Sequence, residues 1–205
     1  MMGKITTVFF DIGGVLFDLQ LEATVDYLAE KCNLNRDQVG KSFPLEVYFE
    51  FERGRMDETS FFNHWRKTLG CNDISDADFT RAWDLLVGEE LPTVGILEKL
   101  LPHYQIWLLS NTNDYHIRTL TPQFLFFEKV HGKIYSYLEG CRKPEPEIFN
   151  LALERAGVTP EESLFIDDMQ VNVDQARKMG ITTIHFTTPE ELEIELKLLG
   201  LVGLD

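Results

Sequence analysis

The chain has few cysteines and few basic residues for its size. Three cysteines occur among 205 residues, and Cys32, Cys71 and Cys141 are too widely spaced to match a disulfide framework or a zinc site. Lysine and arginine together number 19 against 34 acidic residues, which gives a formal net charge of −15. Such a field repels the phosphates of nucleic acids and anionic lipid headgroups. We therefore expect a reducing compartment and neither nucleic acid nor a membrane as partner.

Long apolar runs are also missing. The N-terminal run from Ile5 to Phe10 is too short for a signal peptide or a bilayer-spanning helix, so we predict a cytoplasmic protein. The hydrophobic content of 44% nevertheless suffices for a substantial core. The length allows one domain with an inserted module.

Three apolar segments have the composition of buried strands. Residues 5–10, 105–110 and 163–166 are rich in β-branched, aromatic and aliphatic side chains, as expected for strands that are covered on both faces. Polar residues lie at the end of each segment, namely Asp11 after the first, Ser110-Asn111 at the second and Asp167-Asp168 after the third. In open parallel sheets ligands bind at the carboxyl ends of the strands. These polar residues therefore mark a candidate site.

Helical periodicity separates the predicted strands. Residues 146–156 and 171–179 form amphipathic patterns, each followed by glycine, a common helix-ending residue. Thr188-Pro189-Glu190-Glu191 has the sequence of a helix start. Strands that alternate with helices predict an α/β fold with a Rossmann-like parallel sheet and helices on both faces.

Residues 19–91, called the insertion below, show no convincing strand and several amphipathic helical patterns. Aromatic residues recur there at helical spacing, and we expect them to form the core of the insertion rather than a ligand groove. They are Phe61, Phe62, Trp65, Phe79 and Trp83. The sequence thus predicts a core domain made of residues 1–18 and 92–205 and an α-helical domain inserted at 19–91.

The polar residues at the strand ends, together with Lys143, suit phosphoryl transfer. This chemistry needs a nucleophile, a divalent cation that offsets the charge on phosphate, and fixed donors for the phosphate oxygens. Carboxylates from two strands can bind Mg²⁺, and one of them can attack phosphorus. A hydroxyl, a backbone amide and an ammonium can hold the phosphate. We expect a small phosphorylated metabolite as the ligand.

The order of these motifs resembles the haloacid dehalogenase (HAD) superfamily over essentially the whole chain. Residues 10–16 are similar to its first motif, Leu109-Ser110-Asn111 to its second, Arg142-Lys143-Pro144 to its third, and Ile166-Asp167-Asp168 with Asn172 to its fourth. The resemblance implies that the insertion is a type 1 cap, a four-helix bundle that closes over the site. It is closest to bacterial sugar-phosphate phosphatases, including α-glucose-1-phosphate phosphatases.

The resemblance also assigns roles to individual residues. It makes Asp11 the nucleophile and a metal ligand, and it gives Lys143 the task of neutralising both phosphate and nucleophile. The remaining assignments are Ser110 and Asn111 to phosphate, Gly13 and Asp168 to direct contact with Mg²⁺, Asp167 to direct or water-mediated contact, and Asn172 to support of these ligands.

Gly13 departs from the commonest family pattern, which has an aspartate there that protonates the leaving oxygen and later activates water. Glycine keeps the backbone carbonyl for the metal but loses the acid–base group, which typically contributes about 10²–10⁴-fold. We therefore expect better leaving groups, such as anomeric sugar phosphates or aryl phosphates, to be preferred over alkyl phosphates. Asp18 is a candidate replacement acid, with a substrate-binding or hinge role as the alternative. His116 is expected on a helix surface.

Three other functions compete with a phosphatase. A dehalogenase would share the nucleophile but would not need the acidic pair Asp167-Asp168. A phosphomutase would normally need the acid–base group that Gly13 lacks. A catalytically weakened phosphate- or partner-binding protein is the main alternative. Substrate specificity is expected from residues 43–54, with Tyr48, Glu52 and Arg53 facing the cleft, while the sequence does not indicate the oligomeric state.

Overall fold

A five-stranded parallel sheet forms the centre of the computed structural model, which describes residues 4–201 and 203. The strand order is β5-β4-β1-β6-β7, and every neighbouring pair is parallel. The strands are β1 (Thr7–Phe10), β4 (Gln105–Ser110), β5 (Gly132–Tyr135), β6 (Ser163–Asp167) and β7 (Thr182–His185). The predicted α/β fold is confirmed.

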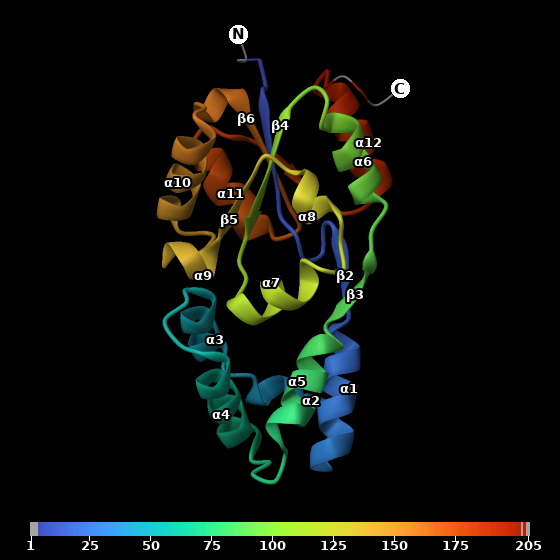
Figure 1. Cartoon of the computed structure of the whole chain (residues 1–205), viewed down its shortest axis with the longest axis vertical. Coiled ribbons are helices and arrows are strands. Elements are labelled where there is room, and N and C mark those ends of the chain that lie inside the picture. The colour runs from blue at the N-terminus through green and yellow to red at the C-terminus, as the bar shows by residue number, and fades with distance from the viewer. Residues whose placement is uncertain (1–3, 202, 204–205) are drawn as a thin grey trace.

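Helices cover both faces of this sheet (Figure 1). Because side chains alternate along a strand, Val8 and Phe10 of β1 pack into one apolar cluster and Phe9 into another. The first cluster includes residues of α6 (Thr93–Leu100), α7 (Asp114–Leu120), α8 (Phe126–Lys129) and α12 (Pro189–Leu198). The second includes residues of α10 (Pro146–Ala156) and α11 (Gln170–Lys178), and the short helices α9 (Ser136–Glu139) and η1 (Pro160–Glu162) lie in the connections.

The helix boundaries follow local sequence signals. Helix α10 covers the predicted residues and ends at Gly157, which has a left-handed backbone with φ of 69°. The side chain of Thr188 accepts a hydrogen bond from the Glu191 N–H at the start of α12, as the predicted cap requires. These two elements were predictable because their first and last residues carry the signals themselves.

Two short strands connect the insertion to the core. Strands β2 (Phe17–Leu19) and β3 (Val87–Glu90) pair antiparallel in a separate two-stranded sheet. The prediction that residues 19–91 contain no strand is therefore wrong for β3. Its four residues are half-buried or exposed, so they lack the apolar alternation by which a strand is recognised.

The insertion contains five helices, where the resemblance implies a four-helix bundle. They are α1 (Leu21–Cys32), α2 (Arg36–Ser42), α3 (Leu45–Glu52), α4 (Glu58–Leu69) and α5 (Asp76–Asp84). In Figure 1 they lie together at the end of the molecule opposite the termini. Phe43 and Pro44 separate α2 from α3, since a residue before proline avoids the helical conformation.

An aromatic cluster and a disulfide hold the insertion together. The predicted aromatic core is confirmed, because Phe61, Phe62, Trp65, Phe79 and Trp83 are each at most 3% exposed and belong to one cluster. Cys32 and Cys71 are joined in a disulfide, so the prediction that the cysteines form no disulfide is wrong for this pair. Their separation of 39 residues hid the proximity, whereas their Cα atoms lie 5.6 Å apart.

None of the helices formed by the described residues has both the length and the apolar character that crossing a bilayer requires.

Candidate active site

The carboxyl ends of the central strands bring the predicted residues together. In the register of the sheet, Phe10 of β1 lies opposite Leu108 of β4 and Ile166 of β6. The residues that follow these positions therefore meet at one edge of the sheet. Asp11 is 8% exposed there and Asp167 is fully buried.

Lys143 lies between these two carboxylates. Its Nζ is 2.9 Å from Asp11 Oδ1 and 2.6 Å from Asp167 Oδ2, and it donates a hydrogen bond of 2.8 Å to the Leu109 carbonyl. Burial alone would lower the pKa of this ammonium, but the two carboxylates raise it above its usual value. A fully buried lysine needs such partners, so Lys143 is held charged at the edge of the sheet.

Three carboxylates are placed to hold a cation. Asp11, Asp167 and Asp168 each offer an oxygen within 4.8 Å of the other two. Burial raises the pKa of Asp11 to about 8 despite the opposing charge of Lys143, and burial with the neighbouring Asp167 raises the pKa of Asp168. A bound divalent cation would favour the ionised forms. Hard oxygen donors of this number suit Mg²⁺.

Gly14 allows the loop after β1 to lie close against the three carboxylates. Its backbone has φ of +76°, and a Cβ atom there would lie 2.7 Å from Asp168 Oδ2. Glycine tolerates the positive φ and leaves space for the carboxylate. The neighbouring Ile12 N–H donates a hydrogen bond of 2.7 Å to Asp11 Oδ1. The loop therefore fixes one carboxylate and makes room for another.

Residues that follow β6 hold the Asp167 carboxylate in place. The Met169 N–H donates to its Oδ1 at 2.8 Å, and Asn172 Nδ2 lies 3.0 and 3.1 Å from its two oxygens. Asn172 is 4% exposed. Together with the Lys143 contact, these bonds use both oxygens of Asp167. Through these contacts Asn172 would support Asp167 as a metal ligand, and that role stays a prediction.

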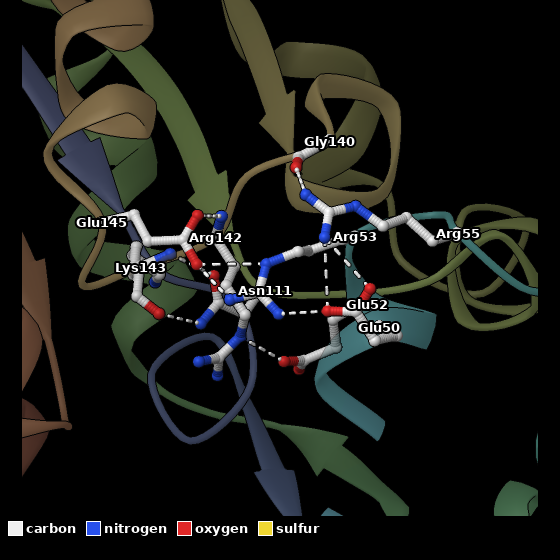
Figure 2. A network of polar contacts seen from close by, with 9 residues as sticks. All are labelled: Glu50, Glu52, Arg53, Arg55, Asn111, Gly140, Arg142, Lys143 and Glu145. Carbon is white, nitrogen blue, oxygen red and sulfur yellow. Dashed lines mark hydrogen bonds and ion pairs between the residues drawn. The ribbon is translucent and has the colours of Figure 1, made fainter. Parts of the chain in front are cut away.

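The side chain of Asn111 holds the backbone of Lys143 from both sides. Its Oδ1 accepts the Lys143 N–H at 2.8 Å, and its Nδ2 donates to the Lys143 carbonyl at 2.9 Å (Figure 2). Sequence reasoning assigned Asn111 to phosphate and missed this contact, because nothing in the spacing of residues 111 and 143 announces it. Ser110 lies beside it, 3% exposed.

A cavity of about 300 Å³ opens above these groups. Six predicted site residues line it, namely Asp11, Gly13, Ser110, Asn111, Asp168 and Asn172. One part of its wall is apolar, with Phe17, Leu19, Leu86, Val87, Ile117 and Leu120. Tyr48 and Glu52 of α3 line it as well, as the sequence predicts, but Arg53 does not. The cavity therefore lies between the insertion and the edge of the sheet.

Glu52 forms a buried ion pair in the wall of this cavity. Its Oε2 is 2.8 Å from Arg142 Nε, and the Arg142 guanidinium stacks 4.0 Å from the centroid of the Phe49 ring. Burial raises the pKa of Glu52, while Arg142 opposes the shift. Glu52 and Arg142 both line the cavity, so the pair adds carboxylate acceptors and guanidinium donors to its wall.

Gly13 borders the cavity without being forced to be glycine by its surroundings. A Cβ atom there would lie 3.4 Å from the side chain of Leu19, which is ordinary van der Waals contact. Asp18 is not among the cavity-lining residues, although its neighbours Phe17 and Leu19 are, and it accepts a hydrogen bond from Gln20. The structure thus brings no carboxylate of Asp18 to the cavity wall.

His116 is not on the surface, so that prediction is wrong. It is 8% exposed and stacks on Trp83 of the insertion with ring centroids 5.1 Å apart. It lines the cavity, and burial lowers its pKa to about 4 against a smaller opposing effect of the Trp83 backbone. The amphipathic pattern of its own helix could not reveal a partner from another domain.

The family model for haloacid dehalogenase-like hydrolases matches residues 5–180. The D-ribitol-5-phosphate phosphatase of Bacteroides thetaiotaomicron is 29% identical over 87% of this chain and 90% of its own. A sesquiterpene phosphatase of Aspergillus oryzae is 25% identical over 95% of each chain.

A solved structure shows the same architecture. It is a HAD family enzyme from Bacteroides thetaiotaomicron in complex with magnesium and inorganic phosphate. The TM-score is 0.79 with 29% identity, over 90% of this chain and 95% of that one.

Proposed function

Because the chain belongs to the haloacid dehalogenase-like hydrolases, we propose that it is a Mg²⁺-dependent phosphatase of small phosphate monoesters. The observation that carries this proposal is the placement of Lys143 between Asp11 and Asp167, beside a third carboxylate and beneath a cavity. Relatives described as phosphatases, and one solved with magnesium and phosphate, support it.

In the proposed reaction, an oxygen of Asp11 attacks phosphorus and the bond between phosphorus and the ester oxygen breaks. The ester oxygen leaves as an oxyanion that takes a proton from water, and an aspartyl-phosphate remains on Asp11. Water then attacks that phosphorus, which releases inorganic phosphate and restores the carboxylate. Lys143 offsets the negative charge of phosphate and nucleophile, while the Ser110 hydroxyl and backbone amides hold phosphate oxygens.

Mg²⁺ would be held by Asp11, Asp168 and the Gly13 carbonyl, with Asp167 contacting it directly or through water. The cation would neutralise phosphate charge and so reduce repulsion between the dianion and Asp11. Asn172 would keep Asp167 in place through the bonds described above.

We propose sugar phosphates as the substrate class. The ribitol-5-phosphate phosphatase relative supports this, as does a cavity of about 300 Å³ that suits a small ester. Tyr48, Glu52 and Arg142 offer hydrogen-bonding groups for hydroxyls. The insertion, proposed to span residues 19–91 between core segments 1–18 and 92–205, would then act as a type 1 cap that selects the organic part.

Gly13 sets a further expectation about the leaving group. Because neither Gly13 nor Asp18 presents an acid to the cavity, esters with good leaving groups should react faster than alkyl esters. Anomeric sugar phosphates and aryl phosphates meet this condition. Equal turnover of α-glucose 1-phosphate and glycerol phosphate would count against it.

The direct test is phosphate release from p-nitrophenyl phosphate, α-glucose 1-phosphate and ribitol 5-phosphate, with Mg²⁺ and with EDTA. We expect Mg²⁺-dependent turnover that falls at least about 10³-fold in Asp11→Asn, since the nucleophile is then missing. If the folded wild-type protein shows no turnover above Asp11→Asn on any ester, the alternative of a phosphate- or partner-binding protein replaces this proposal.

A further inference from the structure

The loop that carries Lys143 is also where the insertion touches the core. This loop, residues 140–145, is called the Lys143 loop below. Three side chains at and just after the end of α3 form polar contacts with it. Arg55 donates to the Gly140 carbonyl at 3.3 Å, Glu52 pairs with Arg142 at 2.8 Å, and Arg53 pairs with Glu145. Figure 2 shows these side chains reaching from the insertion to the loop.

Glu145 connects Arg53 to the backbone of the Lys143 loop. Its Oε1 accepts from Arg53 Nε at 3.1 Å, and its Oε2 accepts from the Arg142 N–H at 3.2 Å. The Glu145 N–H in turn donates to the Arg142 carbonyl at 2.8 Å. Glu145 thereby closes the turn that contains Lys143, and its side chain is oriented by a residue of the insertion.

Arg53 is itself held firmly. Its Nη1 is 2.9 Å from Glu50 Oε1, and its side chain is 18% exposed. The next residue, Gly54, has φ of +68°, and a Cβ atom there would collide with the backbone carbonyl of Tyr137 in α9. At Gly54, the residue after Arg53, the backbone of the insertion therefore lies too close to the backbone of the core for any side chain.

We propose that Arg53 and Glu145 are positioning residues for Lys143, an inference that rests on the proposed phosphatase function and extends it to the control of its lysine. Asn111 fixes the Lys143 backbone from the sheet, and the Arg53–Glu145 pair fixes the same turn from the insertion. Lys143 Nζ must lie within hydrogen-bonding distance of two carboxylates, and a displacement of about 1 Å can cost roughly 10²-fold in rate. The site is complete only when the insertion rests on the loop.

The test compares Arg53→Ala with Arg55→Ala. Both arginines lie in the same segment and both bind Glu50. Arg55 contacts the loop only at its first residue, through one hydrogen bond of 3.3 Å to the Gly140 carbonyl, whereas Arg53 binds Glu145, which closes the turn around Lys143. We expect Arg53→Ala to lower kcat by about tenfold with KM changed less than about twofold, since the lysine acts on the transition state. Arg55→Ala should retain kcat within about twofold, and Arg53→Lys should recover part of the loss.

A double-substitution cycle separates positioning from a general structural effect. Glu145→Gln keeps an acceptor for the Arg142 N–H but loses the ion pair. If the two residues act as one unit, Arg53→Ala combined with Glu145→Gln should lower kcat little more than Arg53→Ala alone. Additive losses, equal losses in Arg53→Ala and Arg55→Ala, or a loss confined to KM would each overturn the inference.

These outcomes are distinct from failure of the proposed function. A wild-type protein without Mg²⁺-dependent turnover refutes the phosphatase proposal and with it this one. An active wild type whose Arg53→Ala variant keeps its kcat refutes the positioning role alone. Circular dichroism melting of each variant shows whether a loss reflects unfolding, and an Arg53→Ala loss that Arg53→Lys does not relieve counts against the ion pair.

Discussion

The edge of the sheet and the insertion are both densely buried, but by different means. At the edge, the charged groups of Asp11, Lys143 and Asp167 are buried together and satisfied by specific hydrogen bonds and ion pairs. In the insertion, aromatic rings fill the core, for example Phe62, which stacks on Phe79 and meets Trp83 edge-on. Charges in a low-dielectric interior depend on each partner, whereas apolar packing distributes its free energy over many contacts.

This difference predicts where single substitutions should be severe. Removing one charge at the edge leaves its partners buried and unpaired. Truncating an apolar side chain in the insertion should lower the free energy of unfolding in proportion to the volume of the cavity that it leaves. Under the proposed function, the chemistry would take place where a few groups fix the geometry, and the organic portion of a substrate would contact the region whose packing is distributed over many side chains.

The largest loss of stability is expected for Lys143→Met, a substitution that keeps the size of the side chain and removes its charge. Asp11 and Asp167 then face each other without a cation, and breaking such a buried arrangement costs about 3–5 kcal/mol. Urea unfolding in EDTA measures the loss. Lys41→Met is the control, because Lys41 pairs with Asp37 on the surface at 76% exposure, where such pairs contribute at most about 1 kcal/mol. Equal losses in the two variants would refute the contrast.

The next effect concerns the disulfide of the insertion. Replacing Cys71 by serine should lower the free energy of unfolding by about 2–4 kcal/mol, while Cys141→Ser, at the half-buried free cysteine, should change it far less. Thiol titration of the denatured wild-type protein should find one reactive thiol without reductant and three with it, as one disulfide and one free cysteine require. Three thiols without reductant would show that the bond does not form.

Much of the core could be predicted from sequence because its signals are local. Strands such as β4 contain a continuous apolar run, here residues 106–109. The polar motif residues at the ends of such strands must meet once the sheet is parallel. The hydrogen bonds between the Asn111 side chain and the Lys143 backbone could not be predicted. The two residues are 32 positions apart, and any residue at position 143 other than proline has the same backbone N–H and C=O groups.

The insertion was less predictable for the same physical reason. Its helices and aromatic core followed from periodicity, but β3 lacks an apolar pattern and the partner of Cys32 depends on how α1 and α4 pack. Contacts between the two regions were missed most completely. Arg53 and Glu145 are separated by 92 residues, and the sequence around either residue does not indicate the other as its partner.

His116 lies where the two regions meet, and the effect predicted for it is the smallest at neutral pH because it develops only as the pH falls below about 6.5. Its native pKa is about 4 and its ordinary value about 6.5, so between these pH values the unfolded chain binds a proton that the native protein does not. The stability present above pH 6.5 is therefore progressively lost as the pH falls towards 4, by at most roughly 3 kcal/mol.

His116→Phe cannot titrate and can still stack on Trp83, so it should remove this part of the acid sensitivity. Urea unfolding of wild type and variant between pH 7 and 4 measures the difference, and His64→Gln, at an exposed histidine of α4, is the matched control. If His116→Phe follows the same pH dependence as His64→Gln, the imidazole is protonated in the native protein. The contact between α7 and the insertion would then tolerate a charge, and the junction would resemble the polar edge of the sheet more than the aromatic core.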